Sequence, residues 1–283
     1  MGGGALVIAI VTILFLLVGE LGKIMQLEYT TVYPLEKEIF VLLFTFVSFG
    51  VLGLIDDLRK TFGLQRSGFW GLRFWVKFLL QITLALGISL MLYFGLGIDI
   101  VNVRFVDIFH IGWLYIPFAT LFIVSFSNAI NISDGLDGLS SGLLVICLFA
   151  LLVLSDAILD STLSIFIGLW IGALLAFLYF NVYPARIWLG DVGSLSFGAT
   201  LAVAGLILGK PIALAIIGGV FVVEALSSLL QLASKRIRGK KLFEVAPLHL
   251  YLQNKGWPEP KIVIRFWLAG AMFALFGLWL GLI

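Results

Sequence analysis

Long apolar runs separated by short polar segments make up most of the sequence. A helix of about 20 residues crosses the roughly 30 Å of hydrocarbon in a bilayer, and nine runs reach or approach that length. They cover approximately residues 4–21, 39–55, 74–94, 113–130, 140–154, 163–180, 194–208, 212–232 and 262–282. The pattern predicts an all-α integral membrane protein, a polytopic bundle of about nine transmembrane helices that forms a single domain over residues 1–283.

Two of these runs and one connecting segment differ from a simple spanning helix. The fifth and seventh runs are short, so their helices are expected to be tilted, to lie in a thinned bilayer or to be partly re-entrant. Residues 95–112 contain alternating β-branched residues, which is typical of a short hairpin. His110 lies in this segment and is expected to be structural, and Cys147 is expected to be a small buried residue within its apolar run.

The composition supports a membrane protein and excludes other classes. Hydrophobic residues make up 61% of the chain and charged residues 12%, whereas a soluble domain has about 45–50% and about 25% respectively. The net charge of +2 is too small to indicate a nucleic-acid partner. A single cysteine provides neither a disulfide framework nor a cysteine-based metal site.

Lysine and arginine residues are distributed unevenly between the two ends of the predicted helices. If the N-terminus is cytoplasmic, all but four of the 18 basic residues lie on or next to cytoplasmic segments. The four on the opposite side are Lys23, Lys37, Arg104 and Lys210. The positive-inside rule therefore predicts this topology, with a cytoplasmic N-terminus.

Five aspartates lie close to the ends of apolar runs: Asp56, Asp57, Asp134, Asp137 and Asp191. The predicted topology places all five on the cytoplasmic side. Carboxylates are costly near hydrocarbon, so acids kept at the ends of spans are expected to have a task such as holding a metal ion. The pattern predicts an integral membrane enzyme with a metal-dependent site at the cytoplasmic face.

Asp56 and Asp57 are adjacent in the segment GLIDDLRK. On a helix their side chains diverge by about 100°. One carboxylate could then face a metal ion while the other faces a reacting hydroxyl or phosphate. The alternative is a solvated acidic pair at a helix end, next to Arg59 and Lys60.

Asn128, Asn131, Asp134 and Asp137 recur at every third position at the end of the fourth run. This spacing predicts a single stripe along one helix face. Amides and carboxylates on such a stripe suit hydrogen bonding to a polar ligand, and Gly135 would let backbone approach the ligand closely. The alternative is a helix C-terminus that glycine caps.

Asp191 is flanked by glycines in the segment WLGDVGS, which leads into the seventh run. Such a segment can present backbone amides to phosphate while the acid binds a divalent ion. The alternative is that the glycines serve only to turn the chain. Trp188 would stack on a base or belong to the interfacial aromatic belt.

Glu224 lies deep within the eighth run, and Gln231 follows two turns later on the same face. An acid at that depth is expected to face the bundle interior and to have a partner, which is either another helix or a substrate. His249 lies in the last cytoplasmic segment, where it would bind phosphate, assist proton transfer or be structural. The basic residues from Lys235 to Lys241 anchor the topology or attract anionic lipid phosphate or nucleotide.

Several longer motifs, found in order along nearly the whole chain, carry a resemblance to a known family. They are GLIDDLRK, SNAINISDGLDGL, FNVYPARIWLGDVGSLSFG, GGVFVVEALSSLLQ and APLHLYLQNKGWPEPKIVIRFW. These segments resemble the polyprenyl-phosphate N-acetylhexosamine-1-phosphate transferase superfamily, and in particular its phospho-N-acetylmuramoyl-pentapeptide transferase family. The last motif separates this family from sibling enzymes that transfer N-acetylglucosamine phosphate, because their corresponding segment ends differently.

The resemblance implies an enzyme of peptidoglycan synthesis in the bacterial inner (cytoplasmic) membrane, with a cytoplasmic active site. Such an enzyme transfers phospho-MurNAc-pentapeptide from UDP-MurNAc-pentapeptide to undecaprenyl phosphate and yields lipid I and UMP. The resemblance also implies Mg²⁺ as cofactor and a homodimer. Direct attack by the lipid phosphate is favoured over a covalent aspartate intermediate, because the lipid phosphate is already a competent nucleophile; both routes remain open.

The resemblance further implies roles for individual residues. Asp191, Asp56 and Asp57 would be catalytic. Asp191 would be the chief Mg²⁺ ligand, and Asp56 and Asp57 would flank the lipid phosphate, one of them deprotonating or positioning it, as candidate further ligands. The substrate-binding residues would be Lys77 near the phosphates, Asn128, Asp134 and Asp137 at the nucleoside pocket, Asn181 on the nucleotide side, Trp188 against uracil, and Gln231, Ala246 and catalytic His249 toward the sugar and pyrophosphate. Asn131 and Gly135 join this set through the spacing described above.

The chain departs from the family pattern at two places. The family has three consecutive histidines where this chain reads His249-Leu250-Tyr251, so roles of the second and third histidines do not transfer. The family usually has ten spans, and Met1-Gly2-Gly3 matches the start of the second. A counterpart of the family's first helix is therefore expected to be absent.

Two other functions remain open from the sequence. One is a sibling enzyme that transfers N-acetylglucosamine-1-phosphate, or a related sugar phosphate, to a polyprenyl phosphate. The other is a secondary transporter that uses its acids for ion coupling. Transporter sites usually lie near the bilayer midplane on broken helices, whereas these aspartates gather at one interface.

Overall fold

The computed structural model describes residues 2–25, 30–62, 72–103 and 107–283. Met1 and two of the basic residues that count toward the predicted topology, Arg66 and Arg104, lie outside the described residues. The helices are α1 (Gly3–Ile24), α2 (Leu35–Phe62), α3 (Phe74–Leu90, extended by a π-helical turn at Met91–Gly95), α4 (Tyr115–Ser133, preceded by a 3₁₀ turn at Gly112–Leu114), α5 (Leu139–Ala157), α6 (Ser161–Asn181), α7 (Gly190–Ile207), α8 (Pro211–Ile217), α9 (Gly219–Arg238), α10 (Leu248–Asn254) and α11 (Glu259–Leu282). The strands are β1 (Ile100–Val103) and β2 (Asp107–His110).

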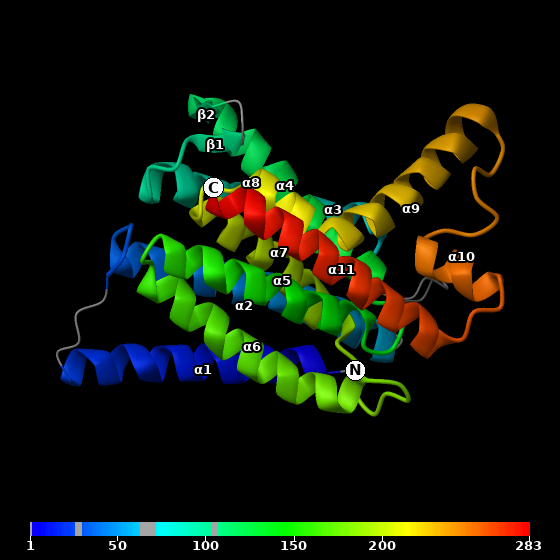
Figure 1. Cartoon of the computed structure of the whole chain (residues 1–283), viewed down its shortest axis with the longest axis horizontal. Coiled ribbons are helices and arrows are strands. Elements are labelled where there is room, and N and C mark those ends of the chain that lie inside the picture. Colours follow the sequence, from blue (N-terminus) through cyan, green and yellow to red (C-terminus); the bar gives the residue numbers. More distant parts are fainter. Residues whose placement is uncertain (1, 26–29, 63–71, 104–106) are drawn as a thin grey trace.

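Most of the long helices run side by side along the long axis of the molecule (Figure 1). Within the described residues, eight helices are long and apolar enough to cross a membrane, and the number is nine if the bent pair α8 and α9 counts as one span. The prediction of a polytopic all-α membrane protein is therefore confirmed.

α7 forms the centre of the bundle, where it packs between α2 and α4. Buried residues make up 89% of its span. Phe197 of α7 stacks on Phe46 of α2 with 5.6 Å between ring centroids, and it meets Trp170 of α6 edge-on at 5.3 Å. The two short predicted runs correspond to α5 and α7, which are continuous helices of 19 and 18 residues. Each is long and apolar enough to cross a membrane as one helix.

The run predicted over residues 212–232 is a broken helix and not a continuous one. This run is divided into α8 and α9, whose axes differ by 82°. The break falls at Gly218 and Gly219, because glycine is a poor helix former and both residues lie against aromatic rings. A Cβ atom on Gly218 would lie 3.0 Å from Phe126, and one on Gly219 would lie 2.7 Å from Phe273. α9 consequently leaves the bundle, as Figure 1 shows at the upper right.

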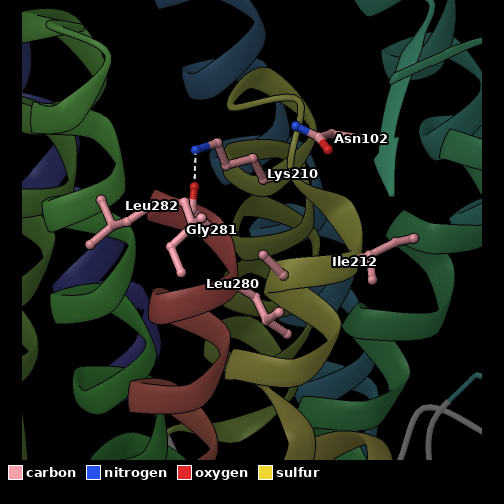
Figure 2. Close-up of a pocket in the computed structure, with 8 residues that line it drawn as sticks. Asn102, Lys210, Ile212, Leu280, Gly281 and Leu282 are labelled. Carbon is pink, nitrogen blue, oxygen red and sulfur yellow. Dashed lines mark hydrogen bonds between the residues drawn. The ribbon is translucent and has the colours of Figure 1, made fainter. Parts of the chain in front are cut away.

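The predicted hairpin is present at the end of the bundle away from the five aspartates at the ends of the apolar runs. β1 pairs antiparallel with β2, and Ile100 lies opposite His110. His110 is largely exposed, with its Nδ1 atom 3.1 Å from Asp99 Oδ1, in keeping with the expected structural role. A hollow between β1 and the ends of α8 and α11, where Lys210 donates to the Gly281 carbonyl, lies at this same end (Figure 2).

Candidate active site

Close packing of α2 against α7 brings three of the predicted aspartates together. α2 continues to Phe62, two turns beyond the predicted end of its apolar run, so Asp56 and Asp57 lie on the helix itself. Asp191 lies in the first turn of α7. Gly53 makes this approach possible, because a Cβ atom there would overlap the carbonyl of Asp191. Asp56 and Asp57 are buried, and the side chain of Asp191 is 15% exposed.

Two lysines occupy the space between these aspartates. The Lys60 ammonium lies 3.0 Å from Asp56 Oδ2, 2.8 Å from Asp191 Oδ2 and 4.0 Å from Asp57 Oδ1. Lys77, from α3, lies 3.0 Å from Asp56 Oδ2 and also contacts Asp191 Oδ2. Lys77 was predicted to lie near phosphates, but Lys60 was assigned no role. Its position four residues after Asp56, on the same helix face, was the available signal.

The side chains of Asp56 and Asp57 diverge, as predicted. Asp56 accepts a hydrogen bond from the Leu72 amide at 2.6 Å and faces the lysines. Asp57 instead accepts from the Val192 amide at 3.2 Å, at the start of α7. A carboxylate at a helix N-terminus interacts favourably with the helix dipole. Gly190, with φ +72°, completes this contact, because a side chain there would meet the Asp57 carboxylate.

The oxygen atoms of this cluster fit a Mg²⁺ ion. A single ammonium group, that of Lys60, already lies within 4.0 Å of all three carboxylates, so one small cation can reach oxygen atoms from each. The described part of the chain contains no ready-made group of three or more His, Cys, Asp or Glu residues for a metal. Mg²⁺ commonly uses one or two carboxylates and takes its remaining ligands from water and substrate phosphate.

The stripe predicted for Asn128 to Asp137 is only half correct. Asn128 and Asn131 lie on α4, but the helix ends at Ser133, so Asp134 and Asp137 lie in the following turn. Asp134 is the C-cap residue of α4, and Gly138, with φ +76°, is the N-cap residue of α5. The alternative of a glycine-capped helix C-terminus is therefore also wrong, although all four polar side chains remain at the same end of the bundle.

The two asparagines of α4 contact different partners. Asn128 pairs with Gln81 of α3, donating from Nδ2 to Gln81 Oε1 at 2.9 Å. Asn131 donates to Asp191 Oδ1 at 3.1 Å and to Ser194 Oγ at 2.8 Å. Asn131 is thus part of the carboxylate cluster, whereas Asn128 fixes α3 to α4. Gln81 was not found by sequence reasoning, since an isolated glutamine in an apolar run carries no distinctive pattern.

Asp134 accepts a hydrogen bond from the Ser140 hydroxyl. Burial, with the negative charges of Asp191 and Asp57 nearby, raises the pKa of Asp134 to about 7. The protonated form of this carboxyl group is therefore much more accessible near neutral pH than that of an ordinary aspartate. A group in that state can donate or accept a hydrogen bond at the edge of a polar ligand.

Asp137 and Asn181 hold the loop between α6 and α7. Asp137 accepts from the Ala185 amide at 2.9 Å and from the indole of Trp188 at 3.2 Å. Asn181 donates to the Ile187 carbonyl at 2.9 Å and accepts from the Ser141 hydroxyl at 2.6 Å. The side chain of Trp188 is half exposed, so its ring is anchored at one edge and open at the face.

His249 is joined to Glu224 in a buried contact between α10 and α9. The Glu224 carboxylate accepts from the His249 amide at 3.0 Å and lies 2.9 Å from His249 Nδ1. Both side chains are almost completely buried. The prediction that Glu224 faces inward and has a partner is confirmed. The His249 ring packs against Gly135, where a Cβ atom would overlap Nε2.

Glu224→Gln is expected to lower turnover by about 10- to 100-fold, the usual range for a residue that orients a functional group. The carboxylate requires a proton on His249 Nδ1, whereas a glutamine amide can donate to Nδ1 and favour the opposite tautomer. This effect is measured as product formation by four proteins: the wild type, Glu224→Gln, His249→Ala and the double variant. If Glu224→Gln lowers turnover by the same factor in the His249→Ala background as in the wild type, Glu224 does not act through His249.

Gln231 and Ala246 lie further along the same region. Gln231 Oε1 accepts from the amides of Leu242 and Phe243, each at 2.9 Å, and Nε2 donates to the Phe243 carbonyl at 2.8 Å. Both ends of its amide therefore hold the loop that follows α9. Ala246 is half-buried in this loop, just before α10. The structure brings neither residue into hydrogen-bond contact with the carboxylate cluster.

A match to a known family covers most of the elements that build this cluster. The sequence profile of glycosyl transferase family 4 matches residues 39–209. The chain belongs to this family. The matched segment includes the three clustered aspartates, both lysines and the α4–α5 turn, while Glu224 and His249 lie beyond it.

Curated relatives are similar over most of the chain. The phospho-N-acetylmuramoyl-pentapeptide-transferase of Thermodesulfovibrio yellowstonii is 38% identical over 259 residues, which cover 84% of this chain and 71% of that protein. The phospho-N-acetylmuramoyl-pentapeptide-transferase of Desulfotalea psychrophila is 39% identical over 259 residues, covering 85% of this chain and 71% of the relative. The resemblance found in the motifs is therefore confirmed, and it places the chain among membrane transferases of this family.

Proposed function

We propose that this protein transfers phospho-MurNAc-pentapeptide from UDP-MurNAc-pentapeptide to undecaprenyl phosphate, producing lipid I and UMP for peptidoglycan synthesis. The similarity to two phospho-N-acetylmuramoyl-pentapeptide-transferases over more than four-fifths of the chain supports this activity. The observation that carries it at the level of residues is the cluster of Asp56, Asp57 and Asp191 around two lysines.

The reaction joins two anionic substrates, so positive charge has to offset their repulsion. Lys60 and Lys77 supply it. In the structure described here both ammonium groups contact Asp191 and Asp56, which holds them at the junction of α2, α3 and α7. We assign to them the binding of the pyrophosphate and of the lipid phosphate.

Asp191, with Asp56 or Asp57, would hold a Mg²⁺ ion through carboxylate oxygens. When bound, the ion supplies Lewis-acid stabilisation of negative charge on the phosphoryl oxygens. Asn131 supports Asp191, because its amide donates to Asp191 Oδ1 and fixes the orientation of that carboxylate. Asp57 is oriented in turn by the Val192 amide.

We favour direct attack of a lipid-phosphate oxygen on the sugar-linked phosphorus of the donor. A new P–O bond joins the lipid phosphate to the phosphosugar, and the P–O bond to the UMP oxygen breaks, so UMP leaves with the electron pair. The ion-paired state of Asp56 and the capping contact of Asp57 fit positioning roles better than proton abstraction. An ionised lipid phosphate needs no base.

The nucleotide side of the site is assigned to the loops next to this cluster. Trp188 presents an open indole face for the uracil ring, while Asp137 holds its edge. Asp134 and Gly135 border the same turn, and His249 packs behind Gly135 toward the sugar and pyrophosphate. The distribution of basic residues supports a cytoplasmic site in the inner membrane. We also propose that the protein forms a homodimer, as the family resemblance implies.

Purified protein mixed with undecaprenyl phosphate and UDP-MurNAc-pentapeptide is expected to release UMP and form a lipid-linked product. Removal of divalent cations with a chelator should abolish the signal, and Mg²⁺ should restore it. UDP-GlcNAc is assayed beside UDP-MurNAc-pentapeptide as the comparison donor. Robust UMP release from UDP-GlcNAc and none from the muropeptide donor would assign the protein to the sibling activity instead.

A further inference from the structure

A second acidic site lies at the end of the bundle opposite the candidate active site. Glu38 lies in the first turn of α2 and Asp160 is the N-cap residue of α6. Glu38 is 18 residues before Asp56 on the same helix, which corresponds to about 27 Å along the axis. The two carboxyl groups lie within hydrogen-bond distance of each other.

Both carboxyl groups are completely buried, yet three of their four oxygens have no hydrogen-bond donor from any other residue. Glu38 and Asp160 are each 0% exposed. One oxygen of Asp160 accepts from the Leu163 amide at 3.1 Å. The other oxygen of Asp160 and both oxygens of Glu38 have no partner outside the pair, and the buried hydroxyl of Thr162 in the same turn of α6 has none.

Buried polar atoms in native proteins are nearly always satisfied, and those that remain point to a water or an ion that completes the site. Within the described residues, no lysine, arginine or histidine forms an ion pair with either carboxylate. Two adjacent buried carboxylates without a counter-charge are very costly. Neutralisation must therefore come from a bound proton or from a cation.

We propose that Glu38 and Asp160 bind a divalent cation of the Ca²⁺ type at this end of the bundle. A single proton shared by the pair satisfies at most one oxygen on each residue, which leaves the other Glu38 oxygen unpartnered and one negative charge in place. A divalent ion neutralises both charges and contacts all three free oxygens. The available atoms are oxygens, and hard divalent cations prefer such ligands.

The neighbouring groups favour retention of negative charge in this site. The Asp160 carboxylate lies at the N-terminus of α6, where the helix dipole stabilises an anion. The Tyr33 hydroxyl donates to the Ile207 carbonyl at 3.1 Å; burial, with Glu38 and Asp160 nearby, raises the pKa of Tyr33 to about 12, so it stays neutral. A cation here would join α2 to α6 and fix the far end of the helix that carries Asp56 and Asp57.

Thermal unfolding of purified, chelator-treated protein tests the proposal. Adding Ca²⁺ at constant pH and ionic strength should raise the unfolding temperature by about 5 °C at a hundredfold excess over Kd. The shift should disappear in Glu38→Gln and in Asp160→Asn. It should persist in Asp156→Asn, an exposed aspartate close by in the sequence. It should also persist in Asp191→Asn, which separates this site from the candidate active site.

Equilibrium dialysis with radioactive Ca²⁺ covers the case in which a variant does not fold. The Asp191→Asn protein should retain one bound Ca²⁺ per chain. A wild-type protein without a Ca²⁺-dependent shift, or a shift equal in Glu38→Gln, would overturn the proposal. Stability that responds to pH but to no divalent cation would identify a shared proton in its place and would also overturn it. None of these outcomes depends on the transferase reaction.

Discussion

Asp191→Asn is expected to lower UMP release by about 10³-fold, the upper range for removing one electrostatic contact in an active site. Asp191 is the acidic residue that meets Lys60, Lys77 and Asn131 at once. Asparagine keeps the shape of the side chain but removes its charge, so the two lysines keep only Asp56 as a shared carboxylate partner. The proposed divalent ion would lose its principal ligand. Product formation at saturating Mg²⁺ measures the effect.

Asp156→Asn is the matched control for this variant. Asp156 lies near the opposite end of the bundle and is exposed, so its loss of charge should leave UMP release within about twofold of the wild type. Both proteins should elute as folded species with similar unfolding temperatures. Activity of Asp191→Asn close to that of the wild type would remove Asp191 from the metal and phosphate site.

Gly53→Ala is expected to reduce both stability and activity. The added methyl group would overlap the Asp191 carbonyl and crowd Val192, which are backbone atoms that a rotamer change cannot move. α2 and α7 must then separate, at a cost of about 1–3 kcal/mol in unfolding free energy. A displacement of about 1 Å between Asp191 and Asp56 would lower turnover by about 100-fold. Thermal unfolding and UMP release measure the two effects.

Gly172→Ala provides the comparison for Gly53→Ala. Gly172 lies in α6 with open space around the position of a Cβ atom, so alanine should be neutral or stabilise the helix by up to about 1 kcal/mol. Activity should be unchanged. Equal tolerance of both substitutions would show that the close approach of α2 to α7 does not determine the geometry of the aspartates.

Much of the architecture was predictable because it follows from local periodicity. Apolar runs of spanning length define most of the helices, and the acids at their ends gather at one side whatever the packing between helices. The hairpin near His110 was predictable from the local alternation of β-branched residues. The inward orientation of Glu224 was predictable for a different reason. A polar group in an apolar environment has few positions in which it can be satisfied.

The remaining features depend on contacts between distant segments. The bend at Gly218 needs the rings of α4 and α11 beside it, and a glycine pair alone does not show whether a helix breaks. Lys60 gains its role only when α7 places Asp191 beside it. Asp134 and Asp137 leave the predicted stripe because the α4–α5 turn forms against His249 and the α6–α7 loop. Residue spacing places Lys60 on the same helix face as Asp56, but it does not contain the contacts between distant segments.

The departure of α9 from the bundle limits how other membrane proteins can approach this one. Its 20 residues extend for about 30 Å, with exposed leucines such as Leu226 and Leu229 along its length. A neighbour on that flank meets this projecting arm before it reaches the other helices.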